Sequence, residues 1–109
     1  MTNKTALVTG ASDGIGLEFC KILAAKGYDL ILVARRKEKL NEVAKSLTEK
    51  HTSINCTVIS ADLSKPQAAQ KLFQATVKKD LQVDFLINNA GLLQNGFFNI
   101  DLHTRPILF

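Results

Sequence analysis

The stretch Thr9-Gly10-Ala11-Ser12-Asp13-Gly14-Ile15-Gly16 decides the fold, because it joins two segments with different apolar patterns. Before it, the run Ala6-Leu7-Val8 predicts a buried strand. After it, apolar residues recur at the helical period: Ile15, Phe19, Ile22 and Leu23. Backbone N–H groups at a helix N-terminus attract an anion, and residues without a Cβ let the backbone approach it closely. The stretch therefore predicts a phosphate-binding turn between a strand and a helix.

Length and composition predict one globular domain over residues 1–109, with an irregular tail over 92–109. The chain has 109 residues, of which 46% are hydrophobic and 22% charged, which is ordinary for a folded domain. No apolar run approaches the roughly 18–20 residues of a membrane span. The first strand starts almost at Met1, so we expect no signal peptide and no membrane partner.

The charged residues, histidines and cysteines indicate neither a nucleic-acid-binding surface nor a metal site. The net charge is +4, but no basic stripe with interleaved aromatic residues is present, so we expect no nucleic-acid partner. His51 and His103 have no second ligand at metal-binding spacing. The chain has two cysteines, Cys20 and Cys56, which are too few for a disulfide framework. We therefore expect two free buried thiols and a cytoplasmic protein.

The order of predicted elements is strand-helix repeated three times and closed by a strand. The expected strands are residues 5–9, 30–33, 55–60 and 85–88, and the expected helices are 14–26, 37–50 and 65–79. Such alternation predicts a doubly wound parallel α/β sheet with strand order 3-2-1-4, whose first two helices cover one face and whose third covers the other. Strand four is then expected to be an unpaired edge.

The third helix carries two further expectations. Ser64 is expected to be its N-cap, with Gln67 completing a capping box and Pro66 in the first turn. Its buried face is expected to hold four apolar residues: Ala69, Leu72, Phe73 and Val77.

A second polar segment is expected opposite the glycine turn. The predicted topology brings the segment Asn88-Asn89-Ala90-Gly91, which follows strand four, to the same end of the sheet. Its small residues would let a ribose or ring lie against the backbone, and its amides supply donors and acceptors. The alternative is an ordinary turn after a strand.

Basic residues at the end of strand two favour NADP(H) over NAD(H). A cofactor with a free 2′-OH usually meets an acidic residue there, whereas this chain has Arg35 and Arg36. An arginine can bind a 2′-phosphate through charge-assisted hydrogen bonds. Asp62, after strand three, could accept a hydrogen bond from the adenine amine or serve as a turn residue before Ser64.

With these residues in place, the chain resembles the short-chain dehydrogenase/reductase family over residues 4–104. The glycine turn, Asp62-Leu63 and Asn88-Asn89-Ala90-Gly91 match its motifs. The resemblance implies a Rossmann-like fold, an NADP-dependent interconversion of a carbonyl and an alcohol, a small carbonyl or alcohol substrate, and homo-oligomers. The residues expected to bind the cofactor are Gly10, Ser12, Asp13, Gly14, Ile15, Gly16, Arg35, Arg36, Asp62, Leu63, Asn88, Asn89, Ala90 and Gly91.

No catalytic residue is assigned, because the family's Tyr-x-x-x-Lys motif is absent from these residues. The single tyrosine, Tyr28, is followed four residues later by Leu32. We expect a chain truncated before the catalytic residues and inactive alone. Alternatives are a non-catalytic NADP(H)-binding or interaction module and, more weakly, a methyltransferase, whose site usually has an acid where Arg35 stands.

Overall fold

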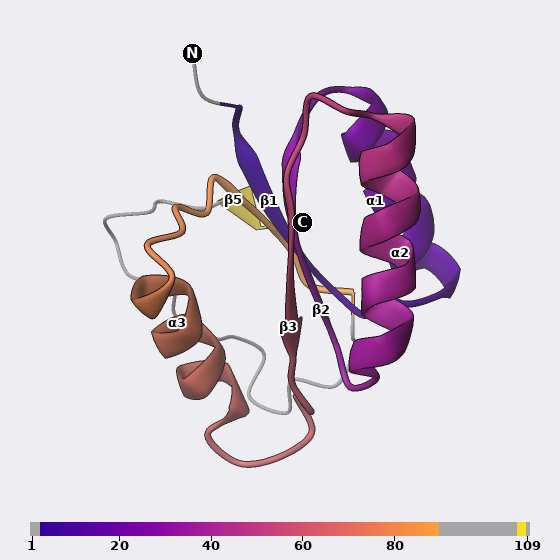
Figure 1. Ribbon diagram of the computed structural model, residues 1–109. Helices are drawn as coiled ribbons and strands as arrows, with labels where there is room; N and C mark the ends of the chain where they lie inside the picture. The colour runs from indigo at the N-terminus through magenta and orange to yellow at the C-terminus, as the bar shows by residue number, and fades with distance from the viewer. Residues whose placement is uncertain (1–2, 90–106, 109) are drawn as a thin grey trace.

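The computed structural model describes residues 3–89 and 107–108 and shows an α/β protein with a single sheet (Figure 1). Its elements, in chain order, are β1 (Thr5–Thr9), α1 (Gly14–Ala25), β2 (Asp29–Ala34), α2 (Lys37–Lys50), β3 (Cys56–Ser60), α3 (Ala68–Lys78), β4 (Phe85–Ile87) and β5 (Ile107–Leu108).

The sheet confirms the predicted topology and adds one strand. The strand order is β3-β2-β1-β4-β5, and every pairing is parallel. Val8 at the centre of the sheet pairs with Leu32 on one side and Ile87 on the other. The expectation that β4 is an unpaired edge is wrong, because β5 pairs with it. The tail over 92–109 is therefore not wholly irregular, since its residues 107–108 form this strand.

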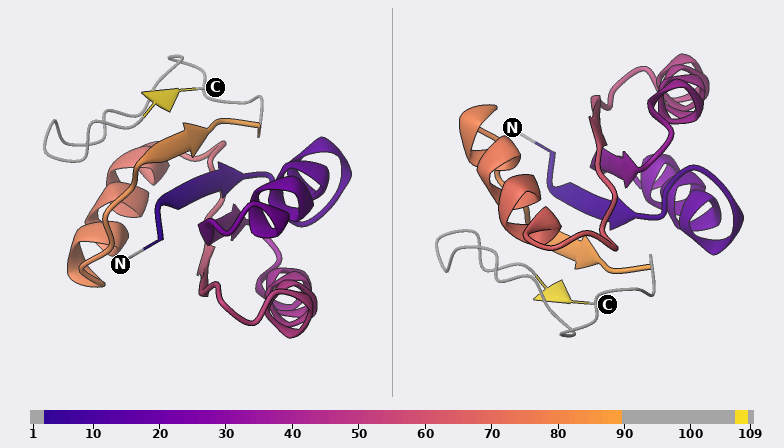
Figure 2. Two further views of the ribbon diagram at one scale, coloured as in Figure 1. Left: turned by 90° about the horizontal axis from the view of Figure 1, so that it is seen from above. Right: turned by 90° about the horizontal axis from the view of Figure 1, so that it is seen from below.

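The helices lie on both faces of the sheet, as Figures 1 and 2 show: α1 and α2 cover one face, and α3 covers the other. Side chains alternate between the two faces along β1, with Ala6 and Val8 in the core beneath α1 and α2 and Leu7 in the core beneath α3. β2 is buried on both faces, which explains its continuous apolar run.

Helix α1 buries a different face from the one that its large apolar residues indicate. Its buried residues are Gly16, Cys20 and Ala24. Ile15 is 67% exposed and Ile22 is 53% exposed. Small side chains at four-residue spacing let the helix backbone approach the sheet closely, so they form the inner face although they are the less apolar residues.

Helix α3 begins later than predicted, and the expected capping box is wrong. The helix starts at Ala68, and Gln67 before it has a left-handed backbone with φ 64°. The backbone N–H and the hydroxyl of Ser64 both donate to Asp62 Oδ1, at 3.0 and 2.5 Å, so Ser64 caps no helix. Val77 is also misassigned, because it is 59% exposed. The residues that α3 buries are Ala68, Leu72 and Thr76.

Smaller features agree with the sequence. Gly27, with φ 88°, ends α1 in the conformation that favours glycine. Tyr28 packs against Phe85 with ring centroids 5.3 Å apart, so its role in the described residues is packing. Both cysteines are free, as expected, but only Cys20 is buried; Cys56 is half-buried, so the expected burial is wrong for Cys56. Burial raises the pKa of the Cys20 thiol to about 12 and that of Cys56 to about 11.

Candidate cofactor site

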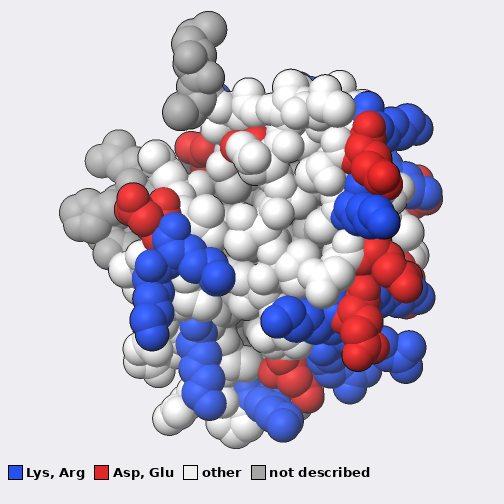
Figure 3. All heavy atoms as spheres, viewed as in Figure 1, with Lys and Arg blue, Asp and Glu red and all other residues white. Residues whose placement is uncertain are grey.

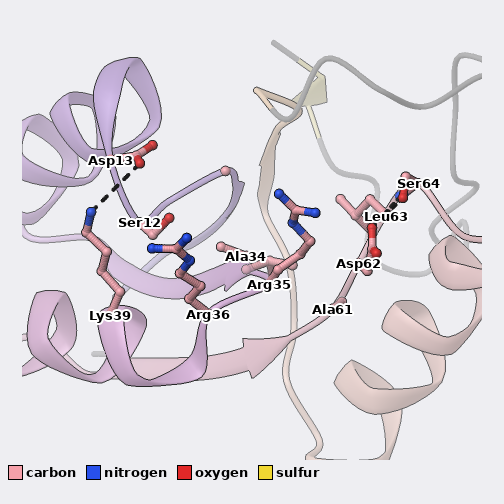
Figure 4. Close-up of a pocket in the computed structure, with 12 residues that line it drawn as sticks. Ser12, Asp13, Ala34, Arg35, Arg36, Lys39, Ala61, Asp62, Leu63 and Ser64 are labelled. Carbon is pink, nitrogen blue, oxygen red and sulfur yellow. Dashed lines mark hydrogen bonds and ion pairs between the residues drawn. The ribbon is translucent and has the colours of Figure 1, made fainter.

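A pocket of about 380 Å³ opens at the carboxyl ends of β1, β2 and β3, on the edge of the sheet where the sequence places the glycine turn (Figure 4). Ligands of doubly wound sheets bind at this edge. The residues that line the pocket are Gly10, Ser12, Asp13, Val33, Ala34, Arg35, Arg36, Lys39, Ala61, Asp62, Leu63 and Ser64.

The glycine turn has the geometry that its sequence predicts, and its three glycines are required for two different reasons. Gly10 and Gly14 have positive φ angles of 65° and 58°. Gly16 is required by close packing instead. A Cβ there would overlap the carbonyl oxygen of Gly10 and lie 2.8 Å from Nδ2 of Asn89. The turn is tied to β2 by the Ala11 amide, which donates to the Val33 carbonyl at 3.2 Å.

The N-terminus of α1 lies directly after this turn. Asp13 is the N-cap residue, with an extended backbone at φ −160°, and its side chain makes no capping hydrogen bond. The first helical hydrogen bond runs from the Leu17 amide to the Asp13 carbonyl at 3.2 Å. The amides of residues 14–16 therefore have no acceptor within the helix, and the helix dipole adds partial positive charge at this end. This geometry suits a phosphate group.

The segment after β4 contacts the glycine turn from the other side. The buried Thr9 hydroxyl donates to the Ile87 carbonyl at 3.4 Å and to Oδ1 of Asn88 at 3.3 Å. Asn89 lies against Gly16, as its approach to the glycine shows. The structure thus brings together the two segments that the sequence places at the switch point. Ala90 and Gly91 lie outside the described residues.

Three cations stand at the opposite end of the pocket, where β2 passes into α2. Arg35 follows the last residue of β2, and its carbonyl accepts a hydrogen bond from the Ser60 hydroxyl at 2.8 Å. Arg36 is the N-cap residue of α2. Lys39 also lines the pocket, which the sequence did not indicate. Figure 4 shows Arg36 and Lys39 rising toward the turn that carries Asp13.

The segment after β3 forms the far wall. Asp62 accepts both hydrogen bonds from Ser64, so the structure shows the turn role that was one of its two interpretations. The hydrogen bonds from Ser64 lower the pKa of the Asp62 carboxyl, and the nearby charge of Arg35 lowers it further. Leu63 lines the pocket and also packs against the core beneath α3.

Not every candidate residue lines the pocket. Five of the described candidates are not among the lining residues: Gly14, Ile15, Gly16, Asn88 and Asn89. Among the residues that the structure describes, no cluster of His, Cys, Asp or Glu could hold a metal ion. Basic and acidic side chains alternate over α2 in the view of Figure 3. No helix in the described part of the chain is long and apolar enough to cross a membrane.

Comparison with known proteins places the chain in a family. The sequence profile described as short chain dehydrogenase matches residues 4–104. The chain is 44% identical over 87 residues to a very-long-chain 3-oxoacyl-CoA reductase of Coccidioides immitis, covering 80% of this chain and 25% of that protein. It is 40% identical over 103 residues to 11-beta-hydroxysteroid dehydrogenase 1A of Arabidopsis thaliana, covering 94% of this chain and 29% of that protein. The chain thus spans between a quarter and a third of the length of these relatives.

Solved structures agree in fold. The L-sorbose reductase of Gluconobacter frateurii, complexed with NADPH and L-sorbose, has a TM-score of 0.76 at 33% identity, covering 83% of this chain and 34% of that one. A short-chain dehydrogenase of Sphingobium yanoikuyae in complex with NADPH has a TM-score of 0.71 at 36% identity, covering 81% and 34%. The profile match over residues 4–104, the Rossmann-like sheet and these likenesses lead to one conclusion: the chain belongs to the short chain dehydrogenase family of oxidoreductases.

Proposed function

We propose that this chain binds NADP(H) in the pocket at the carboxyl edge of its sheet. The observation that carries the proposal is the pairing of two features in one pocket: the glycine turn at one end and Arg35 and Arg36 at the other. A site for NAD(H) usually has an acidic residue at the end of β2 to accept from the ribose 2′-OH. Arginine at that place favours a 2′-phosphate instead.

The pocket and the segment after β4 offer a role to each candidate group. The turn from Gly10 to Gly16 would hold the pyrophosphate on its amides, and Arg35 and Arg36 would hold the 2′-phosphate. Asp62 and Leu63 would lie against the adenine. On the side of β4, the segment of residues 88–91 would border the nicotinamide ribose. NADPH in the complexes of the L-sorbose reductase and the Sphingobium enzyme supports this choice of cofactor.

The proposed reaction is the family's interconversion of a carbonyl compound and an alcohol. The bound cofactor supplies a hydride, and the residues of this chain bind and orient it. The sequence holds no Tyr-x-x-x-Lys motif that could supply or position a proton. We therefore propose that these 109 residues bind NADP(H) without turnover by themselves; the alternative is a non-catalytic NADP(H)-binding or interaction module.

Calorimetric titration with NADPH and NADH tests the proposal. We expect tighter binding of NADPH, and Arg35→Gln to weaken it roughly 10- to 100-fold, as loss of a charged hydrogen bond of about 1.5–3 kcal/mol implies. The same substitution should change NADH binding little. Lys45→Gln, at an exposed position of α2 outside the pocket, is the matched control.

Two results would contradict the proposal. Equal affinity for the two cofactors would remove the preference assigned to Arg35. Oxidation of NADPH by the purified chain with a panel of ketones would overturn the absence of turnover.

A further inference from the structure

One ion pair joins two elements at the proposed cofactor pocket. Nζ of Lys39, in the first turn of α2, lies 3.8 Å from Oδ2 of Asp13 at the N-cap of α1 (Figure 4). Both residues line the pocket. The Lys39 side chain is 44% exposed and that of Asp13 is 76% exposed. The pair thus links the glycine turn to the basic end of the site.

Asp13 is an unusual group for this place. Its side chain makes no capping hydrogen bond to the helix that it precedes. It lies at the helix end where the proposed site binds phosphates. The contact with Lys39 is what the structure supplies to offset the charge of the Asp13 carboxylate.

Lys39 is placed to contact the same anion as Arg36. The two residues are three positions apart at the start of α2, so they share one face of its first turn. An ion pair between exposed side chains contributes little free energy, so a phosphate can compete with Asp13 for the ammonium group. In the structure, the ion pair with Asp13 keeps the Lys39 side chain at the pocket. The same ion pair partly neutralises the positive charge of Lys39.

We propose that Lys39 is a specificity-determining residue for the 2′-phosphate and that Asp13 competes with this phosphate for it. This inference rests on the proposed NADP(H) site. Lys39 strengthens the preference for the phosphorylated cofactor, and Asp13 moderates the affinity by occupying the ammonium group until the phosphate arrives. Lys39 therefore adds to the preference that Arg35 and Arg36 give, and Asp13 lowers the affinity for the phosphorylated cofactor.

Calorimetry on four chains tests the inference: the natural one, Lys39→Gln, Asp13→Asn and the double variant. Adenosine 2′,5′-bisphosphate and adenosine 5′-monophosphate are the probes, because they differ only in the 2′-phosphate. We expect Lys39→Gln to weaken the bisphosphate about 3- to 10-fold and the monophosphate less than about twofold. Asp13→Asn should tighten the bisphosphate roughly 2- to 5-fold, which corresponds to release of one exposed ion pair. Lys45→Gln is again the control.

The double variant decides between competition and simple repulsion. Competition predicts that Asp13→Asn brings no gain once Lys39 is replaced. An equal gain in both backgrounds would overturn the inference, as would a loss in Lys39→Gln that is the same for both probes, since that would place Lys39 on the 5′-phosphate. If Lys39→Gln binds like the natural chain while Arg35→Gln is impaired, the inference fails and the proposed function stands. Failure of the natural chain to bind NADPH overturns both.

Discussion

Replacement of Gly16 by alanine gives the sharpest test of the packing that shapes the glycine turn. In an ordinary helical position this change stabilises by about 1 kcal/mol, because alanine has the higher helix propensity. Here the new Cβ would overlap the Gly10 carbonyl oxygen and lie 2.7 Å from the Gly10 carbonyl carbon and 2.8 Å from Nδ2 of Asn89. These neighbours are mainly backbone, which cannot rotate away.

The expected magnitude follows from these two opposed effects. Overpacking of a close contact costs typically 1–3 kcal/mol, and a backbone neighbour places the cost near ~3 kcal/mol. The helix propensity of alanine returns ~1 kcal/mol, so we expect Gly16→Ala to lower the free energy of unfolding by about 2 kcal/mol. The sign is therefore opposite to that of an unhindered helical glycine.

Urea unfolding followed by circular dichroism measures this free energy. Gly14→Ala is the matched control, because Gly14 has a positive φ of 58° but open space where its Cβ would stand. The free energy of unfolding of Gly14→Ala should fall by about 1 kcal/mol, through backbone strain alone. If Gly16→Ala is as stable as the natural chain or more stable, α1 does not approach Gly10 as closely as described, and the reasoning on the turn is refuted.

Three further predictions test other parts of the structure. Thr9→Val should cost about 1–2 kcal/mol of unfolding free energy, because the hydroxyl that donates to Ile87 and Asn88 is lost; Thr9→Ser, which keeps it, should lose less, and equal losses would contradict this role. Leu72→Ala should cost about 2–5 kcal/mol, whereas Val77→Ala on the exposed side of α3 should change stability by less than about 0.5 kcal/mol, and similar effects would disprove the observed face. Asp62 should titrate below an ordinary aspartate in a carbon-detected NMR titration, and Ser64→Ala should raise its pKa. Because the folded pKa is the lower one, the stability that this carboxylate contributes is present above the unfolded pKa and is lost as the pH falls through the folded pKa; an unshifted midpoint would contradict the turn.

Much of the fold follows from the sequence because its signals are local. The run before Gly10 and the run over residues 30–33 are apolar enough to identify buried parallel strands, and Leu40, Val43 and Leu47 identify the inner face of α2. The strand order then follows from the handedness of the crossovers. The sheet order of β3, β2, β1 and β4 is confirmed for these reasons.

The errors arise where a tertiary contact outweighs a local pattern. For α1 the sequence predicts a helix but no inner face, because the segment is apolar on several sides; the structure shows that Gly16, Cys20 and Ala24 form that face, with Gly16 against Gly10. The sequence around Ser64 is typical of a helix N-cap, but the amide and the hydroxyl of Ser64 both donate to Asp62 instead.

In the candidate site, the residues that belong to contiguous motifs were accessible from the sequence, and Lys39 was not. A single lysine on a charged helix is indistinguishable from other solvated lysines until the fold places it at the pocket beside Asp13. The strand at residues 107–108 was also missed, because two residues carry too little pattern to identify a strand.

The most direct test of the central claim is a two-dimensional ¹H–¹⁵N NMR titration of the chain with NADPH. We predict that the amide signals that shift most belong to two segments, the turn from Gly10 to Gly16 and residues 34–36, with Lys39 beside them. NADH should shift the glycine turn but leave the signals of Arg35 and Arg36 nearly unchanged. Shifts centred on α3, or no shifts at millimolar cofactor, would contradict a nicotinamide dinucleotide site at this edge of the sheet.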